Sequence, residues 1–394
     1  MRIESPDVLK KTEVVGILER ICRALELTAS QHELAKSRYE AVGDWLTGSD
    51  NALLETVTIY PQGSVPLGTT VRPLARQEYD VDLICFVLGV GVGLPPATLK
   101  YAIGERLREN GHYKGILEEM PRCWRLHYAN EFHLDITPSI RNPNCPSGGE
   151  LVPDKKVRQW QPSNPKGYQR WFAERARLRP RIRLVRAALS EGQRAGLEPF
   201  PARMGLKGIL RRTVQLKKRH RDVHFAGLDP SLRPISIIIT TLAAKSYAYC
   251  ATEFEYDSEL DLLRDVVRNM PAFIEERLVQ GRKQWFIWNE TTAGENFAEK
   301  WNSDSSRAEA FFEWHTHATS DLDRVAGLVG LDQITKSLKE SFGEAPVSEA
   351  VHATTKVVSD ARRAGRLSVV PGVGLSIGTP LGSNVRTNTF FGAE

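Results

Sequence analysis

The sequence of 394 residues lacks the marks of secreted and disulfide-stabilised proteins. Its cysteines include no C-x-x-C pair, which argues against a zinc ribbon or a disulfide framework and favours a reducing compartment. The five cysteines are Cys22, Cys85, Cys123, Cys145 and Cys250. Glu4 and Asp7 stand where a signal peptide carries basic and then apolar residues. We therefore expect a cytoplasmic protein.

Long hydrophobic runs and a large net charge are also absent. The longest apolar runs, Leu83–Leu94 and Ile235–Ala244, are too short to cross a bilayer, so we expect no membrane partner. The formal net charge of +5 is small for this length and does not predict binding to long nucleic acids. Positive charge gathers instead in Arg170–Arg186 and Arg203–Arg221, which suits small polyanions such as triphosphates, although solvated helix faces would look the same.

The first part of the sequence predicts a lobe built on a mixed β-sheet. Ser5 and Pro6 predict the start of one helix, and a capping box at Ser30–Glu33 predicts the start of a second. Residues 142–163, rich in Pro, Gly, Ser and Asn, predict a loop that leads out of this lobe. The predicted strands are 56–60, 80–88, 122–128 and 131–137, with a helix near 96–110.

The remainder of the sequence predicts helices and then a flexible tail that is rich in Gly, Ser and Thr. The predicted helices are 167–190, 204–223, 235–250, 258–280, 305–321 and 347–363. The sequence therefore predicts an α+β protein. A sheet lobe with N-terminal helices (1–165) would face a helical lobe (166–365) across a cleft, and a tail (366–394) would follow.

Two carboxylates stand on one face of a predicted strand. In the segment Tyr79-Asp80-Val81-Asp82-Leu83, Asp80 and Asp82 face one way while Val81 and Leu83 face the core, because strand side chains alternate. Neighbouring carboxylates repel each other unless a cation neutralises them, and Mg²⁺ prefers such oxygen ligands. Phosphoryl transfer commonly uses two such ions roughly 4 Å apart.

A third carboxylate would complete the ligand set, and Asp135 is the candidate. The segment Phe132–Ile136 predicts a short alternating strand with Asp135 on one face. Glu131 and Asp154 are the alternatives. Together with the two acids of the preceding strand, Asp135 would bind two Mg²⁺ ions and act in catalysis.

A Gly-Ser turn precedes the first acids by about sixteen residues. Gly63 lets the backbone approach a phosphate closely, and the Ser64 hydroxyl can donate a hydrogen bond to it. We count Gln62, Gly63 and Ser64 as candidate nucleotide-binding residues. Alone, a Gly-Ser pair is usually a turn and an Asp-x-Asp a solvated strand face. Their order and spacing together are typical of nucleotidyltransferases.

Four blocks between about residue 55 and residue 301 carry a resemblance to a known family. They are Gln62–Thr69 with Tyr79–Leu83, Trp160 with Ser163–Tyr168 and Trp171-Phe172, Leu216–Asp222 with Pro234–Ala243, and Glu295–Trp301. Through these blocks the chain resembles the cGAS/DncV-like nucleotidyltransferases (CD-NTases) of bacterial anti-phage (CBASS) systems, within the polymerase-β-like superfamily. The first block specifies only the superfamily, whereas the third and fourth are narrower. The resemblance implies a bilobal, cage-like fold with a polymerase-β-like catalytic lobe.

The resemblance implies an enzyme that joins ATP, GTP or both into a cyclic di- or trinucleotide second messenger, with two Mg²⁺ or Mn²⁺ ions and release of pyrophosphate. Family members hold the donor triphosphate with a lysine of the helical lobe and a serine on the next helix, which match Lys218 and Ser236. The residue before this lysine is usually apolar, whereas here it is Lys217, so both lysines are candidates. Two solvent-facing helix lysines are the structural alternative.

The resemblance also implies partners. The product would act on a cyclic-nucleotide-gated effector. Some family members have C-termini that a ubiquitin-ligase-like protein joins to targets, but this sequence ends in Glu394 rather than Gly or Ala. Two other functions fit the same motifs: a transferase that nucleotidylates tRNA or a protein without cyclisation, and a non-catalytic nucleotide sensor.

Overall fold

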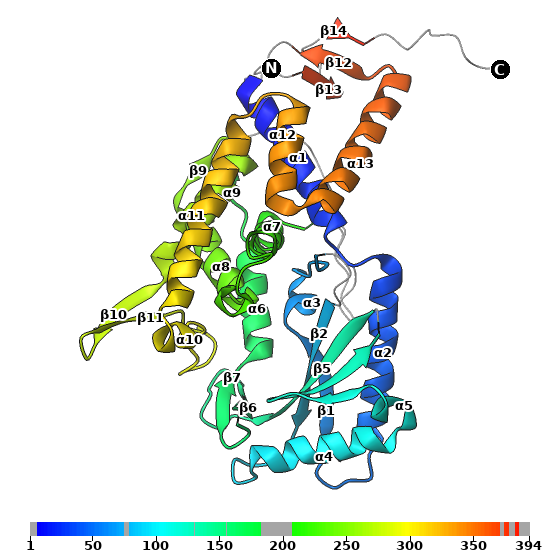
Figure 1. Ribbon diagram of the computed structural model, residues 1–394, viewed down its shortest axis with the longest axis vertical. Coiled ribbons are helices and arrows are strands. Elements are labelled where there is room, and N and C mark those ends of the chain that lie inside the picture. Colours follow the sequence, from blue (N-terminus) through cyan, green and yellow to red (C-terminus); the bar gives the residue numbers. More distant parts are fainter. Residues whose placement is uncertain are drawn as a thin grey trace, which may run out of the picture.

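The computed structural model describes residues 6–74, 79–129, 131–154, 156–182, 207–370, 374–377 and 383–385. It has a lobe built on a β-sheet and a lobe built on helices (Figure 1). The two lobes meet at helices α3 (Ser64–Leu67), α6 (Pro165–Ala176) and α7 (Ile209–His224). The predicted α+β class is confirmed. In the described part of the chain, none of the helices has the length and hydropathy that a bilayer span requires.

Seven strands form the sheet of the first lobe, in the order β1-β2-β5-β4-β3 with β6 and β7 continuing from β5. They are β1 (Val57–Gln62), β2 (Tyr79–Val87), β3 (Leu117–Glu119), β4 (Trp124–Tyr128), β5 (Phe132–Arg141), β6 (Glu150–Pro153) and β7 (Trp160–Ser163). β2 and β5 run parallel, and the other pairs run antiparallel. The four predicted strands are present, but residues 142–163, predicted as a loop, also contain β6 and β7.

Helices cover this sheet. They are α2 (Ala29–Thr47), α4 (Pro96–Glu109) and the short α5 (Gly111–Lys114). α4 packs closely on β4, since a Cβ atom on Gly104 would lie 2.2 Å from the ring of Trp124. The predicted capping box at Ser30–Glu33 is wrong by two residues. Thr28 is the N-cap of α2, and its side chain and backbone exchange hydrogen bonds with the backbone and side chain of Gln31.

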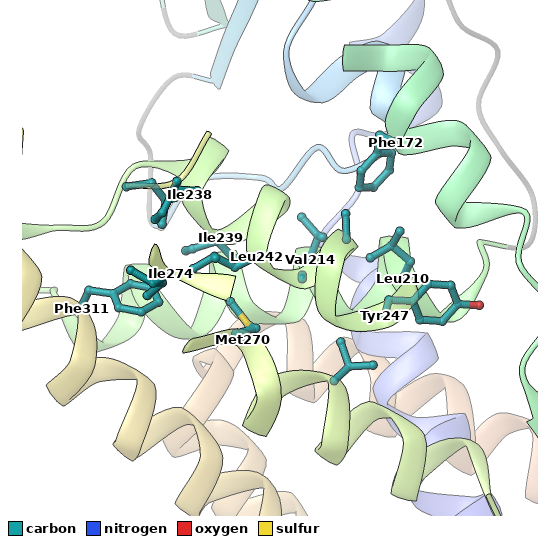
Figure 2. Close-up of a cluster of buried hydrophobic side chains, with 14 of the residues drawn as sticks. Phe172, Leu210, Val214, Ile238, Ile239, Leu242, Tyr247, Met270, Ile274 and Phe311 are labelled. Atoms are coloured by element: carbon teal, nitrogen blue, oxygen red, sulfur yellow. The ribbon is translucent and has the colours of Figure 1, made fainter. Parts of the chain in front are cut away.

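Helix α6 leads from the sheet lobe into the helical lobe (Figure 1). This lobe contains α7, α8 (Ser236–Glu253), α9 (Glu259–Asn269), α10 (Glu299–Ser303), α11 (Ser306–Gly327), α12 (Leu331–Phe342) and α13 (Glu344–Arg363). Short elements connect them: β8 (Arg181–Ile182), η1 (Pro230–Leu232), β9 (Glu255–Tyr256), η2 (Met270–Phe273), β10 (Glu275–Val279) and β11 (Arg282–Phe286). Figure 2 shows their shared core, in which Phe172, Val214, Leu242 and Met270 are fully buried.

The first helix, α1 (Pro6–Ala24), belongs to the helical lobe rather than to the sheet lobe. Its residues Val14, Ile17 and Ile21 are buried in a cluster that also contains Leu216 of α7 and Leu322 of α11. We predicted that residues 1–165 form one lobe, and this boundary is corrected at its start. The sequence shows that α1 has an apolar face, but most of the surface that covers this face lies about 190 residues or more away along the chain.

Several helical predictions differ from the structure. The predicted helix 258–280 ends at Asn269, because Pro271 cannot continue it, and the hairpin β10–β11 follows. Helix α12 was not predicted. The predicted tail contains a small sheet of β12 (Leu367–Val370), β13 (Gly374–Ile377) and β14 (Ser383–Asn384). Residues 183–206, which include one end of each predicted helix 167–190 and 204–223, lie outside the described residues.

Candidate active site

The sheet brings the three predicted acids together. Asp80 and Asp82 lie on one face of β2. Because β2 and β5 run parallel, Asp135 of β5 stands directly beside Asp82 in the register. The alternatives lie elsewhere, since Glu131 precedes β5 and Asp154 caps a turn by accepting the N–H groups of residues 158 and 159. The fold therefore places Asp135, as the third acid, beside Asp80 and Asp82 of β2.

Arg125 of β4 binds this acidic group and was not predicted. Its Nε and Nη2 atoms donate to the two carboxylate oxygens of Asp135 at 2.6 and 2.7 Å. Nη2 also lies 3.7 Å from Oδ1 of Asp80. The buried neighbours of Arg125 on β4 show that it faces away from the core. Only the pairing of β4 with β5, which the sequence does not reveal, places it opposite Asp135.

Burial and mutual repulsion disfavour the charged forms of Asp80 and Asp82. Burial, followed by the charges of Asp135 and Asp80, raises the pKa of Asp82 to about 7. The pKa of Asp80 is also raised, chiefly by desolvation, although Arg125 opposes the rise. The described residues contain no group of three or more His, Cys, Asp or Glu side chains already gathered around a cation position. Two repelling carboxylates with only oxygen donors nevertheless suit a hard divalent cation.

The Gly63 turn lies directly against Asp82. Gly63 has φ +68° and ψ −136° at the start of α3, a conformation that favours glycine. A Cβ atom at this position would lie 2.7 Å from Oδ2 of Asp82. Gln62 is the β1 partner of Asp82 in the sheet register. This position therefore requires glycine, both for its backbone conformation and for the space beside the Asp82 carboxylate.

A cavity of about 700 Å³ between the lobes gathers six of the predicted residues. We call it the triphosphate cavity. The predicted residues that line it are Gly63, Ser64, Asp80, Asp82, Lys218 and Ser236, of which Gly63 forms the turn. Arg221, Asp222 and Arg233 line it as well and were not among the individually named candidate site residues. Its volume falls within the range of small-molecule sites.

The structure separates the two candidate lysines. Nζ of Lys218 donates to the Thr69 carbonyl at 2.9 Å on the wall of the triphosphate cavity. Nζ of Lys217 points to the other side of α7 and donates to the Ala318 carbonyl at 3.1 Å. Burial lowers the pKa of Lys217 to about 7 and that of Lys218 to about 8. Lys218 is therefore the lysine whose position suits a phosphate.

Two arginines add positive charge around Ser236. Nη1 of Arg221 donates to Oγ of Ser236 at 3.0 Å, and Nη2 donates to Asp222 at 2.6 Å. Arg233, half-exposed, lies 3.8 Å from the same carboxylate of Asp222. Arg221 belongs to the basic stretch that the sequence analysis singled out. Arg233 stands alone, so no local pattern identified it.

Helix α7 also grips the segment that follows α3. Arg211, Gln215 and Arg219 donate to the carbonyls of residues 67, 70 and 72 at 3.0, 2.9 and 2.6 Å. With the Lys218–Thr69 bond, four side chains of one helix face hold four of the six carbonyls between residues 67 and 72. The helical lobe thus fixes the backbone that carries Ser64.

A second cavity of about 760 Å³ adjoins the first and shares Gly63, Leu67 and Ile237 with it. We call it the side cavity. Gln62 lines it on the sheet lobe, and Trp288 and Glu295 line it on the helical lobe. Glu295 belongs to the fourth block of the sequence analysis, to which we assigned no chemistry.

The chain is similar to known proteins over most of its length. Residues 13–176 match the family described as the Second Messenger Oligonucleotide or Dinucleotide Synthetase domain. The chain is 28% identical over 388 residues to the c-di-GMP synthase of Roseivirga ehrenbergii, which spans 97% of this chain and 98% of that protein. It is 25% identical over 377 residues to the cyclic dinucleotide synthase CdnG of Bradyrhizobium diazoefficiens, spanning 89% and 86% respectively. The solved structure of the Bradyrhizobium CD-NTase CdnG in complex with GTP has the same fold, with a TM-score of 0.66 at 22% identity. That match covers 86% of this chain and 97% of the solved chain.

Proposed function

We propose that this chain is a cGAS/DncV-like nucleotidyltransferase that joins nucleoside triphosphates into a cyclic dinucleotide with release of pyrophosphate. One observation carries the proposal: the acids of β2, the Gly63-Ser64 turn, Lys218 and Ser236 line a single cavity between the lobes. The names of the two curated relatives support a dinucleotide as the product and GTP as the first substrate to test.

Asp80, Asp82 and Asp135 would hold two Mg²⁺ or Mn²⁺ ions. Bound divalent ions supply charge neutralisation and activation of a hydroxyl. Arg125 also neutralises part of this negative charge, because its guanidinium already lies against the carboxylates of Asp135 and Asp80. For Asp135 to join the other two acids around an ion, its hydrogen bonds with Arg125 must loosen.

The cations of the triphosphate cavity would hold the donor nucleotide. Lys218 would exchange the Thr69 carbonyl for a phosphate oxygen, which is the stronger acceptor because it is charged. Arg233 is half-exposed at the cavity wall and can reach a further phosphate oxygen. The hydroxyls of Ser64 and Ser236 would donate to the same group.

The transfer step exchanges one bond for another. An oxygen of the acceptor ribose attacks the α-phosphorus, the bond from that phosphorus to the bridging oxygen breaks, and pyrophosphate leaves. The hydroxyl proton passes to the Asp135 carboxylate. In a second transfer within the linear product, a ribose hydroxyl attacks the α-phosphorus of the remaining triphosphate, which closes the ring and releases a second pyrophosphate. The protein contributes mainly position and charge, as in other phosphoryl transfers.

We further propose that the protein acts in the cytoplasm in anti-phage signalling, where its product would activate a cyclic-nucleotide-gated effector. A ubiquitin-ligase-like protein acting on the C-terminus is a second proposed partner. Both proposals rest on the resemblance described above.

Incubation with α-³²P-labelled triphosphates and Mg²⁺ or Mn²⁺ tests the proposed function. We expect a phosphatase-resistant labelled product from the wild type and none from the double variant Asp80→Asn, Asp82→Asn. Asp332→Asn, on the exposed start of α12, is the matched control and should keep full activity. A double variant that still forms product would refute the site. Product that appears only with added tRNA or protein would favour the transferase alternative, and nucleotide binding without pyrophosphate release would favour a sensor.

A further inference from the structure

The side cavity contains a carboxylate and an aromatic ring that the proposed chemistry does not use. Both belong to the loop between β11 and α10, which lies beside β7 of the sheet lobe (Figure 1). The cavity adjoins the candidate active site at the Gly63 turn, against which Asp82 packs. A nucleotide whose phosphates or ribose lie at the acids could therefore extend its base into this space.

The ring of Trp288 forms a fixed flat wall. It stacks on Phe286 with ring centres 5.1 Å apart and an angle of 16° between the planes. Its indole Nε1 donates to Oε2 of Glu275 at 2.8 Å, which fixes the orientation of the ring. Trp288 is only partly buried, so its surface is available to the cavity that it lines. Aromatic faces of this kind stack on nucleobases.

Glu295 is held in place by its own loop. Oε2 accepts a hydrogen bond from Nδ2 of Asn289 at 2.7 Å, and the backbone N–H of Asn289 donates to the Glu295 carbonyl at 3.0 Å. Oδ1 of Asn289 in turn accepts from the backbone N–H of Thr291 at 2.9 Å. Within the described part of the chain, no protein donor reaches Oε1 of Glu295. An ionised carboxylate only accepts hydrogen bonds, and each oxygen has two lone pairs.

We propose that the side cavity binds the guanine base of a substrate nucleotide, with Glu295 accepting hydrogen bonds from guanine N1–H and N2–H and Trp288 stacking on the ring. This inference rests on the proposed function and names the base that it uses. Guanine presents two adjacent donors on its Watson–Crick edge, which match the two carboxylate oxygens. Adenine presents one donor and one acceptor there, so its N1 lone pair would face a carboxylate oxygen without a proton between them.

The variant Glu295→Gln tests this assignment, because the amide replaces one acceptor with a donor and so matches adenine. We expect the ratio of kcat/KM for GTP to that for ATP to fall by about 10- to 100-fold, as expected for loss of a hydrogen bond to a charged group. Pyrophosphate release with each triphosphate gives this ratio. Glu309→Gln, an exposed glutamate of α11, carries the same chemical change outside both cavities and should leave the ratio unchanged.

If a variant has no turnover, calorimetric measurement of the affinities of GTP and ATP for the same proteins gives the GTP-to-ATP ratio instead. A wild type that prefers ATP, or an unchanged ratio in both turnover and binding, would overturn the role of Glu295 while the proposed function stands. A wild type that releases no pyrophosphate from any triphosphate would overturn the proposed function. In that case, the binding ratio still decides the role of Glu295.

Discussion

Replacing Lys217 with methionine should stabilise the protein near neutral pH. The lysine side chain is fully buried, and Nζ donates to the Ala318 carbonyl inside the helical lobe. Burial lowers its pKa from 10.5 to about 7, although Asp321 and Asp323 partly oppose the effect. The folded protein therefore disfavours the charged form, whereas the unfolded chain accepts it freely. Methionine has a similar length and carries no charge that must be buried.

The magnitude follows from proton linkage. Between pH 7 and 10.5 the unfolded chain binds a proton at Lys217 that the folded protein does not, so wild-type stability rises with pH by up to about 1.4 kcal/mol per unit. The full difference between the two pKa values corresponds to about 5 kcal/mol. The gain from methionine should therefore be largest at pH 7 and below and should fade towards pH 10.

Urea unfolding at pH 7, 8, 9 and 10, followed by tryptophan fluorescence, measures this difference directly. Lys356→Met is the matched control, because Lys356 is exposed on α13 and its replacement should give a small difference that does not change with pH. The reasoning would be refuted if Lys217→Met were no more stable than the wild type at pH 7. It would also be refuted if its advantage did not depend on pH.

Three further outcomes are expected. Gly63→Ala should lower kcat by about 10- to 100-fold, because its Cβ atom would displace the Asp82 carboxylate, whereas Gly89→Ala, also at positive φ but with open space around it, should keep activity. Lys218→Met should raise KM for the triphosphate by about 10- to 100-fold, whereas Lys217→Met should leave it unchanged. The affinity for Mn²⁺, measured by electron paramagnetic resonance, should fall by about tenfold per unit as the pH drops below about 7 and Asp82 becomes protonated. An affinity that stayed constant from pH 8 to pH 6 would exclude Asp82 as a ligand.

Local patterns in the sequence predicted the acids of β2 and the Gly63-Ser64 turn, whereas Lys218 and Ser236 came from the family resemblance. Strand alternation put Asp80 and Asp82 on one face, and a glycine before a serine predicted the tight turn at Gly63. Each of these features depends on a few consecutive residues. Arg125 was missed because its contact with the acids depends on how β4 pairs with β5. The sequence shows that a residue faces outward but does not show what stands opposite.

The same limit applies to the two lysines. Adjacent residues on a helix point about 100° apart, so either could face a cleft, and only the packing of α7 against α11 settles that Lys217 is buried. The hairpin β10–β11 was missed for a related reason, since exposed strands carry little apolar alternation. Glu295 lies in a block that the sequence analysis identified, but no role could be assigned to it there. Its carboxylate lines a cavity that forms only when the chain packs into its tertiary structure.

The position of α1 has a consequence for synthesis on the ribosome. This helix contacts α13, which lies more than 300 residues later in the chain, and α9 and α7 in between. At roughly 5–20 residues per second, its apolar face would wait roughly 15–60 seconds for the last of its packing partners. During that interval the sheet lobe, which is complete by β7, can already fold. During this interval, the nascent chain exposes the amphipathic helix α1 next to a folded sheet lobe. We therefore expect a chaperone that acts on the nascent chain to bind at α1.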